Sequence, residues 1–257
     1  MISKLCNEFG LNFNGISNGS LDYKINSILE LSASRMSSAG IGSSPYEIIN
    51  NISDSYVDIG SDLYNAVLSS YVVDKDDIAC ASGCTHCCHL NSTIQTKTKT
   101  NAVGMTLLDG VSLLEYLVRI RHTQSAQTVF ENVYTVWTSL PETLDRILCP
   151  FIVDGKCSVY SARPMVCRLY FSNDASHCSE QAAIPANKRQ VDTPIAKMLR
   201  PIRRELNSYA KSIVSQRLPD AVFGYFDFMT TAHTIVSAVL NYQEDMVRHL
   251  INTKQSF

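Results

Sequence analysis

The chain has 257 residues, 45% of them hydrophobic, and a formal net charge of −2. This composition is typical of a globular protein with a buried core, and the length suffices for one large domain or two small ones. The near-neutral charge argues against a protein that binds nucleic acid through bulk electrostatics. Because no run of about 18 apolar residues occurs, we also expect no membrane-spanning segment.

The N-terminal part has the composition of a loosely ordered segment. Residues 1–20 are rich in Asn, Gly and Ser, and residues 32–45 have the small residues of a linker. We therefore expect residues 1–44 to be flexible and residues 45–257 to form a single helical domain. The first residues contain no apolar run that could serve as a secretory signal, so we expect a cytoplasmic protein with reduced cysteines.

Five later segments have apolar residues at every third or fourth position, which predicts amphipathic helices. They cover residues 45–71, about 102–121, about 125–148, 195–217 and about 222–250. Pro45 suits the first turn of the first helix, with Ser43 or Ser44 as its cap. Pro141 is expected to bend or split the third helix. Residues 173–193 are expected to form a loop.

Residues 151–160 differ from the helical segments around them. Asp154-Gly155 lies between two short β-prone runs, which is a strong signal for a hairpin with a two-residue turn. A short helix is then expected to start at Ser161-Ala-Arg-Pro. Together these patterns predict a mainly α protein, a helical bundle with one small β-hairpin and a cysteine-ligated metal site.

Eight of the nine cysteines fall between residues 80 and 178. The spacing of the first four predicts either one side of a helix or an irregular turn, since Gly83 weakens a helix. The second four are expected at a helix end, on the hairpin, on a short helix and in a loop. All eight are candidate metal ligands: Cys80, Cys84, Cys87, Cys88, Cys149, Cys157, Cys167 and Cys178.

These residue types point to a metal because thiolates that come together in a reducing compartment usually hold one. Eight thiolates exceed the ligands of one tetrahedral ion. Two zinc ions, or an iron–sulfur cluster with further thiols, fit the number better. A disulfide framework is the less favoured alternative in a chain of this length without a secretory signal. Lys156, Arg163 and Arg168 are candidates to offset the thiolate charge, with simple solvation at the surface as the alternative.

The cysteine pattern also resembles a known family. The pattern consists of Cys-x3-Cys-x2-Cys-Cys, then Cys149-Pro150-Phe151, Asp154-Gly155-Lys156-Cys157-Ser158-Val159-Tyr160, Arg163-Pro164, Cys167-Arg168 and Cys178. Over roughly residues 80–180 it is similar to the YkgJ-type cysteine-cluster proteins. That family is described as a zinc- or iron-chelating domain whose activity is mostly undefined. The resemblance therefore implies that the chain binds zinc or iron.

Three functions from different classes stay open at this point. The first is a metal-binding protein that holds zinc, iron or an iron–sulfur cluster. The second is an iron–sulfur-dependent enzyme similar to the flagellin lysine N-methylases, which carry such a cluster in longer chains. The third is a zinc-stapled adaptor that docks a protein partner on the basic helix at residues 195–217. The sequence does not decide whether the chain is an enzyme; it predicts a metal ion as partner, and neither nucleic acid nor a membrane.

Overall fold

The computed structural model covers the whole chain and describes residues 18–71, 83–90, 104–139, 147–170, 172, 174–183 and 194–241. Helices predominate among these residues, and the strands are short. The chain forms two compact units, each assembled from separate stretches of sequence. Unit 1 comprises Met1–Cys80, Met165–Ala175 and Gln190–Pro219, and unit 2 comprises Ala81–Pro164, Ser176–Arg189 and Asp220–Phe257.

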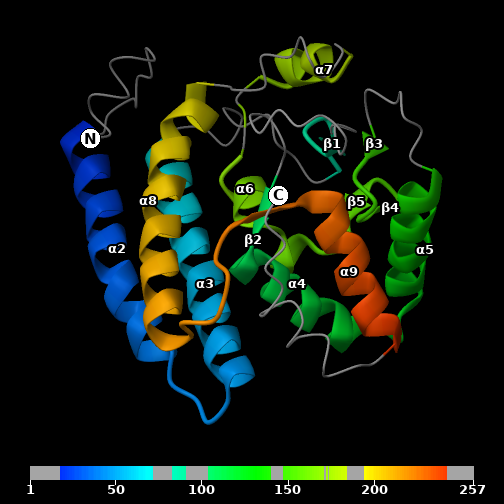
Figure 1. Cartoon of the computed structure of the whole chain (residues 1–257). Helices are drawn as coiled ribbons and strands as arrows, with labels where there is room; N and C mark the ends of the chain where they lie inside the picture. The colour runs from blue at the N-terminus through cyan, green and yellow to red at the C-terminus, as the bar shows by residue number, and fades with distance from the viewer. Residues whose placement is uncertain are drawn as a thin grey trace. The chain divides into compact units, whose positions relative to one another are not determined.

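Unit 1 is built on three long helices that lie side by side (Figure 1). They are α2 (Asn18–Ala39), α3 (Pro45–Tyr71) and α8 (Pro194–Arg217). Helix α3 buries one apolar stripe, which consists of Ile49, Ile52, Tyr56, Ile59, Leu63 and Val67. The buried hydroxyl of Tyr56 donates a hydrogen bond to Asn207 Oδ1 of α8 at 2.6 Å. The predicted helix at residues 45–71 is thus confirmed, and its apolar face is the one that packs.

The start of α3 follows the predicted cap. Ser44 Oγ accepts a hydrogen bond from the Glu47 amide at 3.2 Å, and Glu47 Oε2 accepts one from the Ser43 amide at 2.8 Å. These bonds satisfy amide groups that have no partner within the helix. Pro45 occupies the first helical position, where its missing N–H group costs nothing.

Helix α2 lies where we expected a flexible segment and a linker. Four of its residues recur at every third or fourth position and are buried: Ile25, Leu29, Ser32 and Met36. This buried stripe faces a helical neighbour, because α2 contacts both α3 and α8. Burial against α3 and α8 outweighs the modest helix propensity of the many serines. The division into residues 1–44 and 45–257 stays a prediction from the sequence.

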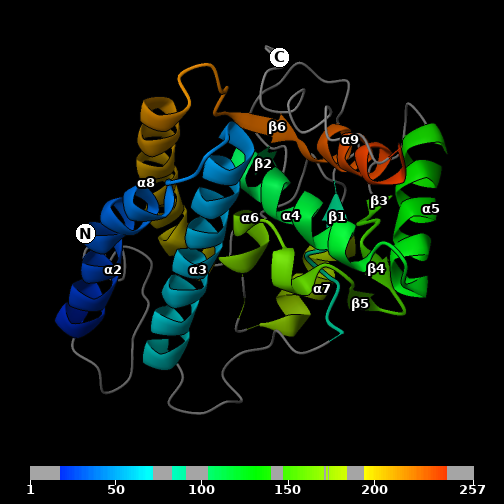
Figure 2. The same cartoon turned by 90° about the horizontal axis from the view of Figure 1, so that it is seen from below.

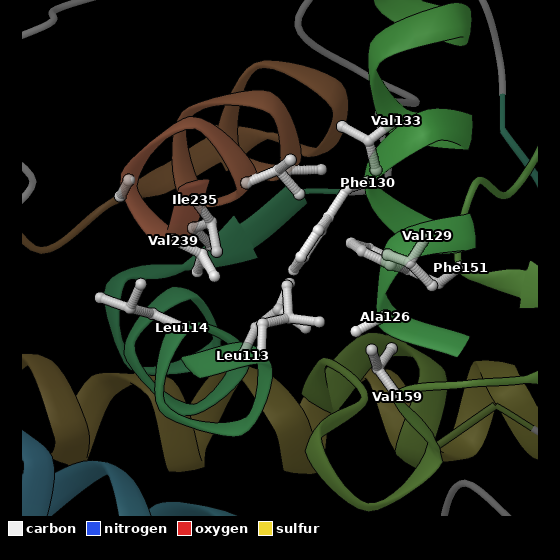
Figure 3. Packing of buried hydrophobic residues seen from close by; sticks show 14 of the residues in the cluster. Leu113, Leu114, Ala126, Val129, Phe130, Val133, Phe151, Val159, Ile235 and Val239 are labelled. Carbon is white, nitrogen blue, oxygen red and sulfur yellow. The ribbon is translucent and has the colours of Figure 1, made fainter. Parts of the chain in front are cut away.

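Unit 2 contains the helices α4 (Leu107–Ile120), α5 (Gln124–Ser139) and α9 (Phe228–Asn241), which Figure 2 shows as ribbons. Their side chains form an apolar cluster. Helix α9 contacts both α4 and α5. The close view in Figure 3 shows side chains from all three helices converging, among them Leu113, Leu114, Val129, Phe130, Val133, Ile235 and Val239. Phe151 and Val159 join the same cluster from the segment that follows α5.

Three two-stranded antiparallel sheets occur among the described residues, where we expected one hairpin. Strand β1 (His89–Leu90) pairs with β3 (Ile147–Leu148), β2 (Gly104–Thr106) with β6 (Tyr225–Asp227), and β4 (Ile152–Val153) with β5 (Lys156–Cys157). The β4–β5 pair is the predicted hairpin. The other two pairs join segments far apart in the sequence. Because β2 and β6 precede α4 and α9, these helices begin later than we predicted.

Two expectations about cysteine-bearing segments were wrong. Helix α5 ends at Ser139 and residues 147–148 form β3, so Cys149 follows a strand and not a helix. Residues 173–193 include helix α7 (Ala175–Ala183), so Cys178 lies on a helix and not in a loop. Alanine, glutamine and glutamate, which favour helix, supply much of α7. Pro141 lies outside the described residues.

No helix in the described part of the chain is both long enough and apolar enough to cross a membrane.

Candidate metal centre

The β4–β5 hairpin is anchored in the core of unit 2 by apolar residues on both sides of its turn. Phe151 is only 1% exposed, and its ring meets that of Phe228 edge-on with centroids 5.8 Å apart. Val159 is buried to the same extent. Asp154 and Gly155 have φ values of 50° and 72°, as a two-residue Asp-Gly turn requires. The core therefore fixes the strand that carries Cys157.

Polar side chains of α4 and α5 bind the main chain of the same segment. The hydroxyl of Tyr116 donates to the Ser158 carbonyl oxygen at 3.1 Å. Asn132 Nδ2 donates to the Pro150 carbonyl oxygen at 3.3 Å. Since carbonyl groups outside regular structure still need partners, these bonds stabilise one path of the chain. Cys149 and Cys157, which lie beside the bound residues, are half-buried against the core.

The first cysteines lie in an irregular turn, which was one of the two conformations that we predicted. The Cys88 amide donates to the Thr85 carbonyl oxygen at 2.9 Å and closes a four-residue turn. Gly83 has a φ of 90°, a conformation that favours glycine. Of the two predicted conformations, residues 83–90 therefore adopt the irregular turn and not the continuous helix. Cys80 lies outside the described residues.

Main-chain hydrogen bonds join the two cysteine segments. Strand β1 runs antiparallel to β3 with His89 opposite Leu148, and the Cys149 amide donates to the Cys88 carbonyl oxygen at 2.7 Å. The hairpin turn is also near the first segment, because a Cβ atom placed on Gly83 would lie 3.9 Å from the Gly155 carbonyl oxygen. Residues that are distant in the sequence thus meet in one region of unit 2.

The thiols of this region act on one another. A hydrogen bond with the Cys88 side chain, together with burial, raises the pKa of Cys87 far above its ordinary value, and the positive charge of Arg163 opposes this rise. Burial raises the pKa of Cys157, while a hydrogen bond from the Val159 amide and the charge of Arg163 lower it. A bound cation would favour the thiolate forms in the same direction as Arg163 does.

The remaining predicted ligands lie on other elements. Cys167 is exposed on α6 (Met165–Arg168), which packs against α3 in unit 1. Cys178 is half-buried on α7. The structure therefore places five of the eight predicted ligands on the two joined segments of unit 2. These five are Cys84, Cys87, Cys88, Cys149 and Cys157.

The donor chemistry fits zinc or iron. The seven cysteines in the described part of the chain are present as thiols and not as disulfides. Thiolate sulfur is a preferred ligand of both metals. Within the described residues no three Cys, His, Asp or Glu side chains form a group that could hold a metal ion. The Cys87 thiol interacts with the thiols of Cys88 and Cys157.

Two contributors to this region were not predicted from the sequence. One is the Val159 amide, which donates to Cys157 two residues earlier. The other is Tyr160, whose ring lies 3.9 Å from the guanidinium carbon of Arg163. A hydrogen bond from a main-chain amide cannot be predicted from residue types, because every residue except proline has this donor. The spacing of Tyr160 and Arg163, three residues apart, was the available signal for the stacked pair.

Comparison with known proteins agrees with the cysteine pattern. Residues 79–190 match the CxxCxxCC family, which is described as "Putative zinc- or iron-chelating domain". The match spans all eight predicted ligands and confirms the resemblance found in the sequence. No curated protein and no solved structure gives a significant match to the chain. Residues 79–190 of this chain are therefore similar to the CxxCxxCC family.

Proposed function

We propose that the cysteine-rich region of unit 2 binds zinc or iron. The observation that carries this proposal is the main-chain pairing of Cys88 with Cys149, which joins two cysteine segments inside a stretch that matches a chelating family. A bound metal ion replaces the thiol protons, and its positive charge stabilises the thiolates. Metal binding would in this way overcome the raised pKa of Cys87 and Cys157.

The proposed ligands in this region are the five cysteines on the joined segments, Cys84, Cys87, Cys88, Cys149 and Cys157. Because no three of their thiols form one group in the structure, a metal ion would draw them closer together. Three of them lie in a turn, and the other two lie beside β3 and on the hairpin. Turns and hairpins often supply thiolate ligands to a metal. The assignment of Cys80, Cys167 and Cys178 as ligands stays a prediction from the sequence.

Metal analysis of protein purified without air tests the proposal. About two zinc ions per chain without visible colour would support zinc sites. Iron with acid-labile sulfide and visible absorbance would support an iron–sulfur cluster. A folded protein that takes up neither metal, even after incubation with zinc or ferrous iron and sulfide, would contradict the proposal.

Serine variants test each half of the region separately. We expect Cys87→Ser and Cys157→Ser each to lower the metal content, because a hydroxyl is a poor substitute for a thiolate. Cys6→Ser is the matched control, since Cys6 lies apart from the other eight cysteines in the sequence. If one variant keeps the metal content of the unmodified protein, that cysteine is not a ligand.

A further inference from the structure

Cys88 and Cys149 are direct cross-strand partners. The register of β1 and β3 puts His89 opposite Leu148. One residue further out on each strand, Cys88 lies opposite Cys149, and the hydrogen bond of 2.7 Å from the Cys149 amide to the Cys88 carbonyl oxygen is the one that this register requires. Residues directly opposite one another in an antiparallel pair have their side chains on the same face. The two cysteine side chains therefore lie on one side of the β1–β3 ribbon.

Main-chain hydrogen bonds fix the position of both cysteines. The Cys88 amide donates to the Thr85 carbonyl oxygen at 2.9 Å, and the Cys149 carbonyl oxygen accepts from the Ile152 amide at 3.0 Å. Together with the bond between the two cysteines, these contacts engage the amide and the carbonyl group of each. The backbone, and not a contact between sulfur atoms, therefore places the two side chains opposite each other.

The spacing of this pair suits a disulfide that forms and breaks. Opposite residues that share a ladder hydrogen bond have Cα atoms about 5.5 Å apart, and disulfides span Cα distances of about 4.4–6.8 Å. Their Cβ atoms lie about 4.5–5.5 Å apart, which is wider than the about 3.5–4.5 Å of a relaxed disulfide. A bond between Cys88 and Cys149 would therefore be mildly strained, and strained disulfides are the easily reduced ones.

The adjacent cysteine is a poorer partner for Cys88. Neighbouring residues have Cα atoms about 3.8 Å apart across a trans peptide, which is shorter than the span of an ordinary disulfide. A bond between Cys87 and Cys88 would thus distort the turn that they share. Cys88 and Cys149 are both only half-buried, so a small oxidant can reach them.

We propose that Cys88 and Cys149 form a reversible disulfide and that this bond and a metal ion exclude each other at the pair. The exclusion rests on the proposed function, whereas the bond itself does not. Glutathione disulfide can serve as the oxidant: one cysteine thiol attacks it and releases one glutathione thiol. The other cysteine then attacks the mixed disulfide and releases the second. Two cysteine thiols are oxidised and one glutathione disulfide is reduced, and the bonded sulfurs are no longer thiolates that could bind a metal.

Peptide mapping of the full chain tests the bond. The protein is stripped of metal with a chelator, treated with one equivalent of glutathione disulfide, alkylated and digested with trypsin. Cleavage after Lys156 separates Cys149 from Cys157. Mass spectrometry should then find the Cys149 peptide linked to the peptide of the first cysteines, and dithiothreitol should release it. A different main link, or none, would overturn the inference.

Serine variants identify the partner within the first segment. Cys88→Ser should lose most of the link to the Cys149 peptide, because the remaining cysteines are not opposite Cys149. Cys87→Ser is the matched control, since it removes the adjacent thiol and should keep the link. If Cys87→Ser loses the link and Cys88→Ser keeps it, the cross-strand pair is refuted.

Zinc separates this inference from the proposed function. Protein loaded with zinc should form the link more slowly than metal-free protein, and oxidised protein should bind less zinc until dithiothreitol is added. Equal rates of linking with and without bound zinc would overturn the exclusion while the proposed function stands. If the reduced protein binds no zinc or iron but still forms the link, the proposed function fails and the disulfide stands.

Discussion

Replacing Phe151 by alanine tests whether the core of unit 2 holds the cysteine hairpin in place. Phe151 is the first residue of the hairpin segment, 1% exposed, and lies two residues from Cys149. Its ring enters the apolar cluster of unit 2 (Figure 3). It meets the ring of Phe228 edge-on. The mutation removes this contact and leaves a cavity inside a closely packed core.

The expected cost is large in relation to the stability of a typical domain. Truncating a fully buried phenylalanine to alanine lowers the free energy of unfolding by about 3–5 kcal/mol. An edge-to-face aromatic pair contributes about 0.5–1.5 kcal/mol beyond its buried area. Since domains unfold with about 5–15 kcal/mol, Phe151→Ala should destabilise unit 2 severely. Phe151→Leu, which keeps most of the apolar volume, should cost less than about 1.5 kcal/mol.

Urea unfolding followed by tryptophan fluorescence measures this effect. Trp137 is the sole tryptophan, lies on α5 and packs against the same cluster, so its emission reports on unit 2. Tyr134→Ala on the same helix is the matched control, because Tyr134 is 62% exposed and its loss should change stability by no more than about 0.5 kcal/mol. If Phe151→Ala cost no more than Tyr134→Ala, the core would not anchor the hairpin.

Three further predictions concern unit 2 and use the same unfolding assay. The Thr106 hydroxyl accepts a hydrogen bond from the Asp109 amide at 3.2 Å and donates one to Asp109 Oδ2 at 2.8 Å. Thr106→Ala removes this cap of α4 and should lower the free energy of unfolding by about 1–2 kcal/mol. An unchanged unfolding midpoint would refute this prediction. Gly155→Ala forces a side chain into a φ of 72° and should cost about 1 kcal/mol, whereas a gain in stability would contradict the turn. Burial lowers the pKa of His233, whose ring stacks on Trp137 at 4.5 Å, below its ordinary 6.5. Below pH 6.5 the unfolded chain therefore binds a proton at His233 more readily than the folded chain does, and the free energy of unfolding should fall. This fall should be smaller in His233→Gln. Identical pH profiles of stability in the two proteins would exclude a contribution from His233.

The elements that could be predicted are those whose signals are local. Pro45 with its serine caps marked the start of α3, and Asp154-Gly155 marked the hairpin turn, because turn and cap chemistry act within a few residues. Helix α2 was missed because its serines and asparagines are poor helix formers. Burial of Ile25 and Met36 against neighbouring helices outweighs that preference, and propensity alone could not indicate such burial.

The pairing of β1 with β3 could not be predicted for a different reason. Each strand has two residues, and the alternation that marks a strand needs at least four. Cys149 was therefore assigned to the end of a helix. The hydrogen bond from Arg168 to Ser61 of α3 likewise could be found only in the tertiary structure. The cysteine spacing predicted that thiols would gather, and the main-chain bond that joins the segments of Cys88 and Cys149 could be found only in the fold.

The way in which the two cysteine segments are joined bears on how any metal experiment is interpreted. The bond between Cys149 and Cys88 uses an amide and a carbonyl group, and the anchors at Tyr116 and Asn132 also bind main-chain oxygens. None of these bonds needs a sulfur atom, so a serine at position 87 or 157 leaves all of them in place. Two measurements on such a variant then identify a ligand. The metal-free variant should unfold at the same midpoint as the metal-free unmodified protein, and it should bind less metal. If the segments were instead joined only through their thiols, every serine variant would also lose the fold, and ligation could not be separated from stability.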